Sequence, residues 1–137
     1  MNWLVPILVV GAFLVFFGLK RMSFVSAEAA RTYLREGALV IDVRSAEEFR
    51  GGHLASALNI PLGELHGSLP RAVPDKTQVL LLHCLSGGRS AIAKHQAKGL
   101  GYTRVFNLGG YRRAATIVGC ESSSNGTSSP GPEEKPS

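Results

Sequence analysis

The stretch at residues 79–90, VLLLHCLSGGRS, constrains the fold of this chain more than any other. It opens with a wholly apolar run, reaches Cys84, and continues through two adjacent glycines into an alanine-rich segment. A short apolar run of this kind is typical of a strand buried on both faces of a parallel sheet. The residues after it predict a tight loop and then a helix over residues 90–100.

Cys84 stands at the head of this loop, where its sulfur would be activated. A tight loop aims backbone N–H groups at its centre, and the following helix adds the positive end of its dipole. This setting favours a thiolate, so we expect a lowered pKa and a nucleophilic sulfur at Cys84. The alternative is an inert buried cysteine. An inert cysteine does not need the glycine loop, so the sequence favours the nucleophile.

The spacing from Cys84 to Arg89, with four residues between them, resembles the active-site loop of the rhodanese family of sulfurtransferases. The resemblance implies that Cys84 accepts sulfur from a small-molecule or protein donor, such as thiosulfate or a persulfide. It would hold the sulfur as a persulfide and pass it to a thiol acceptor, with no cofactor. The loop residues that would bind the persulfide are Leu85, Ser86, Gly87, Gly88 and Arg89. The family often has a basic or polar residue where this chain has Leu85, which weakens the expected affinity for thiosulfate.

Three earlier segments extend the resemblance. Residues 42–44, 47–49 and 52–61 are similar to the paired rhodanese signatures, although Ala55 and Ser56 stand where the family usually has Pro-Gly. With the cysteine loop, these segments carry the match over roughly residues 24–118. The resemblance, and the alternation of apolar runs with helical segments, predict one α/β domain. We expect a parallel sheet of four or five strands with helices on both faces.

The individual elements are predicted from apolar patterns, helix caps and turn residues. Ser26 is expected to cap a helix that ends at Gly37. The strands are expected at residues 38–41, 79–82 and 102–108, and the helices at residues 27–36, 46–50, 62–69, 90–100 and 111–118.

Two other functions stay open. The segment from His83 to Ser90 also resembles the phosphatase signature His-Cys-x5-Arg-Ser/Thr, which implies a phosphatase or an arsenate reductase, but its loop is one residue shorter. A shorter loop offers fewer N–H groups and a smaller cradle, which suits a terminal sulfur better than a tetrahedral phosphate. The second alternative is a membrane-tethered rhodanese-like binding module whose cysteine takes little part in turnover.

Four residues are expected to support the cysteine. Asp42 and Arg44 should form a buried or half-buried pair that ties a strand to its loop. Ser90 should support the start of the helix that follows the loop. Arg89 is expected to brace the loop and add positive charge rather than to act as an acid or a base.

The four histidines are not assigned to catalysis. His83 should point to the sheet face opposite Cys84, because side chains alternate along a strand. His53 is expected to be a turn residue, and His66 and His95 lie singly among surface-like residues. No spacing of His, Cys, Asp and Glu resembles a metal site, so no metal is expected.

The N-terminal segment predicts a membrane anchor. Residues 3–19 carry no charge, and at about 1.5 Å per residue they would span roughly 26 Å, near the lower limit for crossing a bilayer. Trp3, Lys20 and Arg21 resemble interfacial anchors. The basic pair predicts a single-pass helix with the following domain on the cytoplasmic side, as in a bacterial inner membrane. The alternatives are a cleaved signal peptide, with a site near residues 25–27, and a buried helix.

The chain therefore divides into three predicted parts. These are an anchor at residues 1–22, a rhodanese-like domain at residues 23–119, and a Ser, Gly and Pro-rich tail at residues 120–137 that should be disordered. Fourteen basic and seven acidic residues lie within residues 20–119, which favours anionic lipid headgroups and anionic sulfur donors. Aromatic residues are not interleaved with the basic ones, so no nucleic acid is expected as a partner. A reactive Cys84 requires a reducing compartment. Cys120 is expected to be an incidental thiol, and the alternative is a resolving thiol.

Overall fold

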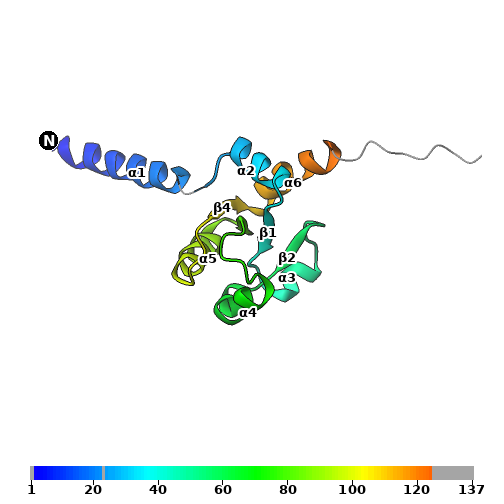
Figure 1. Cartoon of the computed structure of the whole chain (residues 1–137). Helices are drawn as coiled ribbons and strands as arrows, with labels where there is room; N and C mark the ends of the chain where they lie inside the picture. Colours follow the sequence, from blue (N-terminus) through cyan, green and yellow to red (C-terminus); the bar gives the residue numbers. More distant parts are fainter. Residues whose placement is uncertain (1, 23, 125–137) are drawn as a thin grey trace, which may run out of the picture.

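Four parallel strands form one sheet in the order β2-β1-β3-β4 (Figure 1). The structure is a computed structural model, and it describes residues 2–22 and 24–124. The strands are β1 (Leu39–Asp42), β2 (Ala57–Asn59), β3 (Leu80–Cys84) and β4 (Val105–Gly110). The helices are α1 (Leu4–Met22), α2 (Ala27–Arg35), α3 (Ala46–Arg50), the 3-10 helix η1 (Leu62–Glu64), α4 (Leu65–Ala72), α5 (Gly88–Gly99) and α6 (Tyr111–Ser124).

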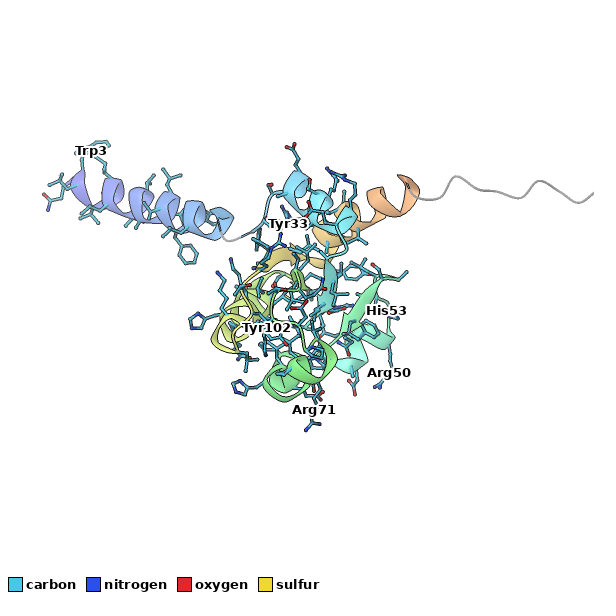
Figure 2. The ribbon with its side chains drawn as sticks, viewed as in Figure 1. Trp3, Tyr33, Arg50, His53, Arg71 and Tyr102 are labelled. Carbon is cyan, nitrogen blue, oxygen red and sulfur yellow. The ribbon has the colours of Figure 1, made fainter. Side chains whose placement is uncertain are left out.

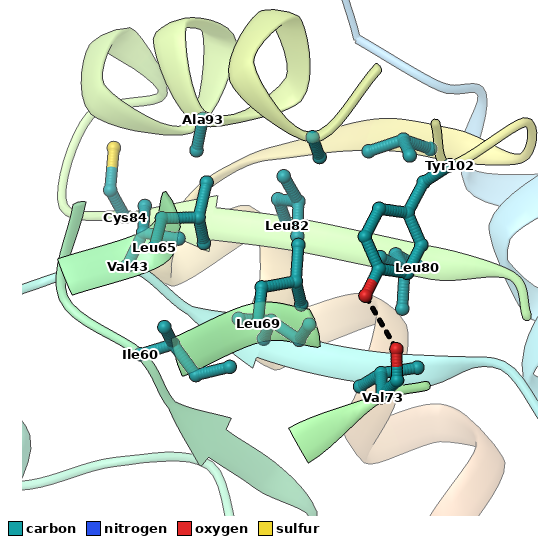
Figure 3. Close-up of a cluster of buried hydrophobic side chains, with 13 residues drawn as sticks. Val43, Ile60, Leu65, Leu69, Val73, Leu80, Leu82, Cys84, Ala93 and Tyr102 are labelled. Atoms are coloured by element: carbon teal, nitrogen blue, oxygen red, sulfur yellow. Dashed lines mark hydrogen bonds between the residues drawn. The ribbon is translucent and has the colours of Figure 1, made fainter. Parts of the chain in front are cut away.

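Helices cover both faces of this sheet. On one face, Leu69 of α4 and Ala93 of α5 are buried against the β3 side chain of Leu82 (Figure 3). On the other face, Ala30 of α2 and Ile117 of α6 belong to a second buried cluster. Helices α2, α4, α5 and α6 therefore bury apolar side chains against a sheet that is apolar on both sides. The predicted parallel sheet with helices on both faces is confirmed, with four strands in the described residues.

The central strand β3 places Cys84 at the edge of the sheet where the strands end. All five of its residues are buried, and it pairs with both β1 and β4. Its register places His83 opposite Asp42 and Cys84 opposite Gly110. Because the strands are parallel, their carboxyl ends meet at the same edge, where ligands bind in open α/β sheets.

The last strand lies later in the chain than residues 102–108, where it was predicted. Tyr102 lies between α5 and the strand, where its N–H donates to the Ala97 carbonyl. Its hydroxyl donates to the Val73 carbonyl, and its side chain joins the core. The strand continues through Gly109, which has a φ of +98° that only glycine adopts easily, to Gly110. The predicted helix at residues 90–100 begins earlier, at Gly88.

Helix α6 continues to Ser124, beyond its predicted end at residue 118. Gly119 costs only about 1 kcal/mol relative to alanine inside a helix, and Glu121 is a good helix former. The first part of the predicted disordered tail is therefore helical. Residues 125–137 lie outside the described residues, as does the side chain of Cys120, and the division of the chain into three parts stays a prediction.

The prediction of a transmembrane helix at residues 3–19 is not supported by the structure, in which residues 4–19 fall in helix α1. Its large apolar side chains between Leu4 and Leu19 are all exposed, and Figure 2 shows them standing out around the helix. Within the part of the chain that the structure describes, no helix is long and apolar enough to cross a membrane. Within α1 the uncharged stretch ends at Leu19, directly before Lys20 and Arg21.

We expect the sheet and its covering helices to fold without α1. A chain that lacks residues 1–22 should unfold cooperatively at the melting temperature of the full chain, because α1 leaves its apolar side chains exposed. Circular dichroism during heating checks this. A truncated chain without a cooperative transition would show that α1 belongs to the folding unit.

Candidate active site

Cys84 ends β3 and turns its side chain toward the core between the sheet and helices α4 and α5 (Figure 3). The residue has no exposed surface. Its sulfur accepts the backbone N–H of Gly87, at 3.0 Å, and lies 3.6 Å from the Ser90 hydroxyl oxygen. The loop that follows the strand therefore places a backbone N–H and a hydroxyl beside the sulfur. That the loop binds an anion stays a prediction.

Two glycines give the loop its shape. Gly87 precedes α5 with a φ of +95°, and a Cβ there would lie 2.8 Å from the ring of Phe24. Gly110 faces the loop from β4, and a Cβ there would lie 2.8 Å from the carbonyl oxygen of Leu85. The same carbonyl accepts the N–H of Tyr111 at 3.2 Å. Larger residues at either glycine would push the loop away from the sulfur.

Asn107 of β4 holds the loop by hydrogen bonds, a role that the sequence analysis missed. This buried residue of β4 donates from Nδ2 to the Gly87 carbonyl at 3.2 Å. Its Oδ1 accepts the Ser90 hydroxyl at 2.7 Å and the Gly109 N–H at 2.9 Å. The available signal was a single amide within the apolar run of a predicted strand, since a buried polar group needs partners.

Ser90 connects this network to the sulfur. Its hydroxyl lies within hydrogen-bond distance of the Asn107 amide oxygen, the Gly87 carbonyl and the Cys84 sulfur. A hydroxyl has one hydrogen and so donates to one acceptor at a time. A Ser90 hydroxyl turned toward the sulfur would donate to the Cys84 thiolate and stabilise its charge.

The pKa of Cys84 lies below the ordinary value for a cysteine. Burial acts in the opposite direction and is the largest single influence, because a desolvated thiolate is unfavourable. The hydrogen bonds from Ser90, Gly87 and Ser86 together outweigh the burial and lower the pKa of Cys84. The loop therefore favours the thiolate, which is the state that a nucleophile requires, although the sulfur is buried.

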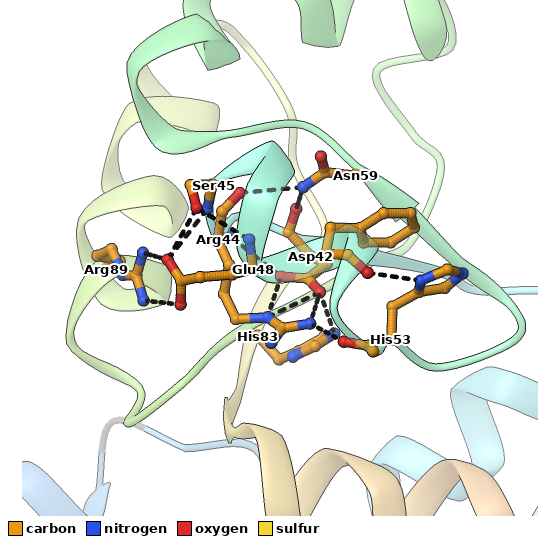
Figure 4. Close-up of polar contacts among 10 residues, drawn as sticks. Asp42, Arg44, Ser45, Glu48, His53, Asn59, His83 and Arg89 are labelled. Atoms are coloured by element: carbon orange, nitrogen blue, oxygen red, sulfur yellow. Dashed lines mark hydrogen bonds and ion pairs between the residues drawn. The ribbon is translucent and has the colours of Figure 1, made fainter.

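Arg89, at the end of the loop, is held by Glu48 of α3. Its two terminal nitrogens donate to the two carboxylate oxygens at 2.7 and 2.9 Å (Figure 4). The Arg89 hydrogen bonds are the main cause that lowers the pKa of Glu48 to about 2, so the carboxylate is ionised at neutral pH. The sequence predicted that Arg89 braces the loop but did not identify its partner, although Ser45 and Glu48 have the spacing of a capping box.

Asp42 and Arg44 form the predicted buried pair. The Arg44 Nη2 donates to Asp42 Oδ2 at 2.7 Å and to the carbonyl of Gly52 at 2.8 Å. The pair thus ties the end of β1 to the segment after α3, and Asn59 donates to the backbone carbonyls of both residues. These contacts shape the edge of the sheet beside the cysteine loop.

His83 points away from Cys84, as predicted from strand alternation. It lies beside Asp42, with 3.8 Å between His83 Nε2 and Asp42 Oδ2 (Figure 4). Neither ring nitrogen has a hydrogen-bond partner among the described residues. Burial lowers the pKa of His83, which keeps the imidazole neutral. Its position gives it no contact with the sulfur, so it is not a general base for Cys84.

The other histidines lie apart from the cysteine loop. The Nδ1 of His53 lies 2.7 Å from the Phe49 carbonyl, and the two rings stack. His66 and His95 are exposed. Among the residues that the structure describes, no group of three or more His, Cys, Asp or Glu could hold a metal ion.

The network predicts how Cys84 titrates. In wild-type protein the rate of alkylation by iodoacetamide should rise with pH around a midpoint below that of free cysteine. Ser90→Ala removes the hydroxyl beside the sulfur and should move the midpoint to higher pH. Ser86→Ala is the matched control, because it removes an exposed hydroxyl but keeps the backbone N–H. Equal midpoints for wild type and Ser90→Ala would contradict the role assigned to Ser90.

Comparisons with known proteins identify the family to which this chain is similar. The Rhodanese-like domain family matches residues 26–115, more than half of the chain. The thiosulfate sulfurtransferase PspE of Escherichia coli is 40% identical over 75 residues, which cover 55% of this chain and 72% of that protein. The human thiosulfate:glutathione sulfurtransferase is 36% identical over 102 residues, which cover 65% of this chain and 89% of that protein.

A solved structure of a human single-domain sulfurtransferase has the same fold. It is 35% identical in sequence, with a TM-score of 0.60 over 69% of this chain and 96% of that one. The family match, these relatives and the loop around Cys84 agree, and we conclude that the chain belongs to the rhodanese-like domain family.

Proposed function

We propose that this protein is a rhodanese-type sulfurtransferase that moves a sulfane sulfur from a donor to a thiol acceptor through a persulfide on Cys84. One observation carries the proposal: the Cys84 sulfur accepts the Gly87 N–H inside a loop that has four residues between Cys84 and Arg89. The family match and the similarity to proteins named as thiosulfate sulfurtransferases support it.

The reaction has two steps that balance without a further reactant. In the first, the Cys84 thiolate attacks the sulfane sulfur of the donor, and a new S–S bond forms. The old bond to that sulfur breaks, and its electron pair leaves with sulfite from thiosulfate or with a thiolate from a persulfide. In the second, an acceptor thiolate attacks the outer sulfur, and Cys84 leaves as a thiolate.

The loop residues have separate roles in this scheme. The backbone N–H groups of residues 85–89 surround the persulfide and stabilise its negative charge. Arg89 braces the loop through Glu48. Ser90 supports the sulfur, and the Asp42–Arg44 pair supports the neighbouring edge of the sheet.

This geometry favours sulfur transfer over the two alternatives. A phosphatase or arsenate reductase needs a cradle for a tetrahedral anion, whereas only four residues separate Cys84 from Arg89, so this loop offers fewer N–H groups and a smaller cradle. A binding module with little turnover does not need a lowered pKa at Cys84, which this loop provides against the effect of burial.

Intact-mass measurement tests the proposal directly. After incubation with thiosulfate or polysulfide, wild-type protein and Cys120→Ser should gain one sulfur atom and release it to a thiol or to cyanide. Cys84→Ser should gain none, because a hydroxyl has a far higher pKa and cannot form a persulfide. Hydrolysis of an aryl phosphate by the wild type, without sulfur on Cys84, would establish the phosphatase alternative. A folded protein with neither activity would favour the binding module.

We also propose that residues 3–19 associate with a lipid bilayer, with the domain at the cytoplasmic face of a bacterial inner membrane. The exposed apolar side chains of α1 support the association. Lys20 and Arg21, which follow the apolar run, would be attracted to the anionic cytoplasmic leaflet. The cytoplasm also keeps thiols reduced, as a reactive Cys84 requires.

Flotation with phosphatidylglycerol vesicles tests the association. The full chain should float with the vesicles in a density gradient, and the chain without residues 1–22 should stay at the bottom. If the full chain also stays at the bottom, α1 does not bind lipid. If both chains float and both are released by salt, the basic surface of the domain accounts for binding instead of α1.

A further inference from the structure

The arginine of the cysteine loop is already neutralised within the protein. Arg89 gives two parallel hydrogen bonds to the two carboxylate oxygens of Glu48. Such a bidentate pair uses the guanidinium edge that would otherwise bind an oxyanion. An oxyanion at the loop therefore meets a paired arginine and a neighbouring carboxylate instead of a free cation.

Glu48 is fixed in this position by its own helix. Its Oε1 also accepts the N–H and the hydroxyl of Ser45, at 3.3 and 3.2 Å, in the capping box that begins α3 (Figure 4). The side chains of Arg89 and Glu48 are both about one-third exposed, at 36% and 34%, so the pair lies at the surface of the site. Arg89 can turn toward a substrate only by giving up both of its bonds to a carboxylate that stays in place.

The residue beside the nucleophile is apolar and open to solvent. Leu85 is 61% exposed, although its carbonyl is held by the Tyr111 N–H. The backbone of Leu85 is therefore fixed while its side chain faces outward. An approaching donor meets an aliphatic surface next to Cys84.

We infer, on the basis of the proposed function, that the donor is an organic persulfide rather than thiosulfate, and that Glu48 is a residue that determines this specificity. Thiosulfate brings two negative charges to a site where the loop arginine is paired with a carboxylate. The persulfide group of an organic donor carries at most one negative charge, and in its protonated form R–S–SH it carries none. The organic group of the donor also provides an apolar surface for Leu85.

The transfer from a persulfide balances as written. The Cys84 thiolate attacks the terminal sulfur of R–S–SH, and a Cys84–S–SH group forms. The bond between the two donor sulfurs breaks, and R–S⁻ leaves with the electron pair. One negative charge enters and one leaves, so the step needs no counter-charge from Arg89.

The test compares two donors, thiosulfate and the persulfide of 2-mercaptoethanol, by the rate at which each places sulfur on Cys84. The measured quantity is the ratio of kcat/KM for thiosulfate to kcat/KM for the persulfide. Glu48→Gln removes the carboxylate charge but keeps a side chain of the same shape, and should raise the ratio about tenfold, mainly through a lower KM for thiosulfate. Glu47→Gln is the matched control, because it removes the same charge from an exposed neighbour in the same turn of α3. It should leave the ratio unchanged.

Two further variants keep the test decisive if Glu48→Gln does not fold. Glu48→Asp retains the charge and should keep the ratio low. Leu85→Lys puts an unpaired cation beside the sulfur and should raise the ratio, whereas Leu39→Lys, at the opposite end of the parallel strands, should not.

Each outcome has one meaning. Equal losses with both donors in Glu48→Gln would show that Glu48 only supports the loop, and a wild-type preference for thiosulfate would overturn the inference. If no donor loads sulfur on wild-type Cys84, the proposed function itself fails, which is a separate result.

Discussion

The hydrogen bond from the Gly87 N–H to the Cys84 sulfur is the contact on which the rest of the site depends. It is made by a glycine with a positive φ, and only glycine fits there, because the Phe24 ring occupies the space where a side chain would lie. The carbonyl of the same residue, Gly87, accepts a hydrogen bond from the Asn107 side chain. The strand, the loop and the last strand of the sheet thus act together to aim one N–H group at one sulfur atom.

Buried polar groups surround this contact, and most of them are paired. Burying a polar group without a partner costs roughly 1–3 kcal/mol, so the Ser90–Asn107 bond and the Asp42–Arg44 pair allow polar atoms beneath the loop. His83 is the exception among these residues, because its ring nitrogens have no hydrogen-bond partner in the described part of the chain. Its lowered pKa is consistent with this, since a neutral imidazole is less costly to bury than a charged one.

The sequence predicted the elements whose signals are local. The apolar run that ends at Cys84 identified the central strand, and the glycines after it identified the loop, because both follow from residue types alone. Asn107 and the Glu48–Arg89 pair could not be predicted with equal ease, because each joins segments that are distant in the chain. The length of α6 was underestimated, since a polar, serine-rich composition does not by itself end a helix. The transmembrane helix was predicted from the uncharged run at residues 3–19, and no helix of the described residues is long and apolar enough to cross a membrane.

Charge acts on this site at two distances. The domain carries an excess of basic residues, and such a field attracts any anion and raises its rate of encounter. At contact distance this field does not determine which donor binds, because Arg89, the one arginine within the cysteine loop, is hydrogen-bonded to Glu48. Long-range attraction thus sets how often an anionic donor arrives, and the Glu48–Arg89 pair sets which donor stays. A change in salt concentration should therefore alter the arrival of thiosulfate and of an anionic persulfide in the same direction. The choice between them depends on the carboxylate beside the loop.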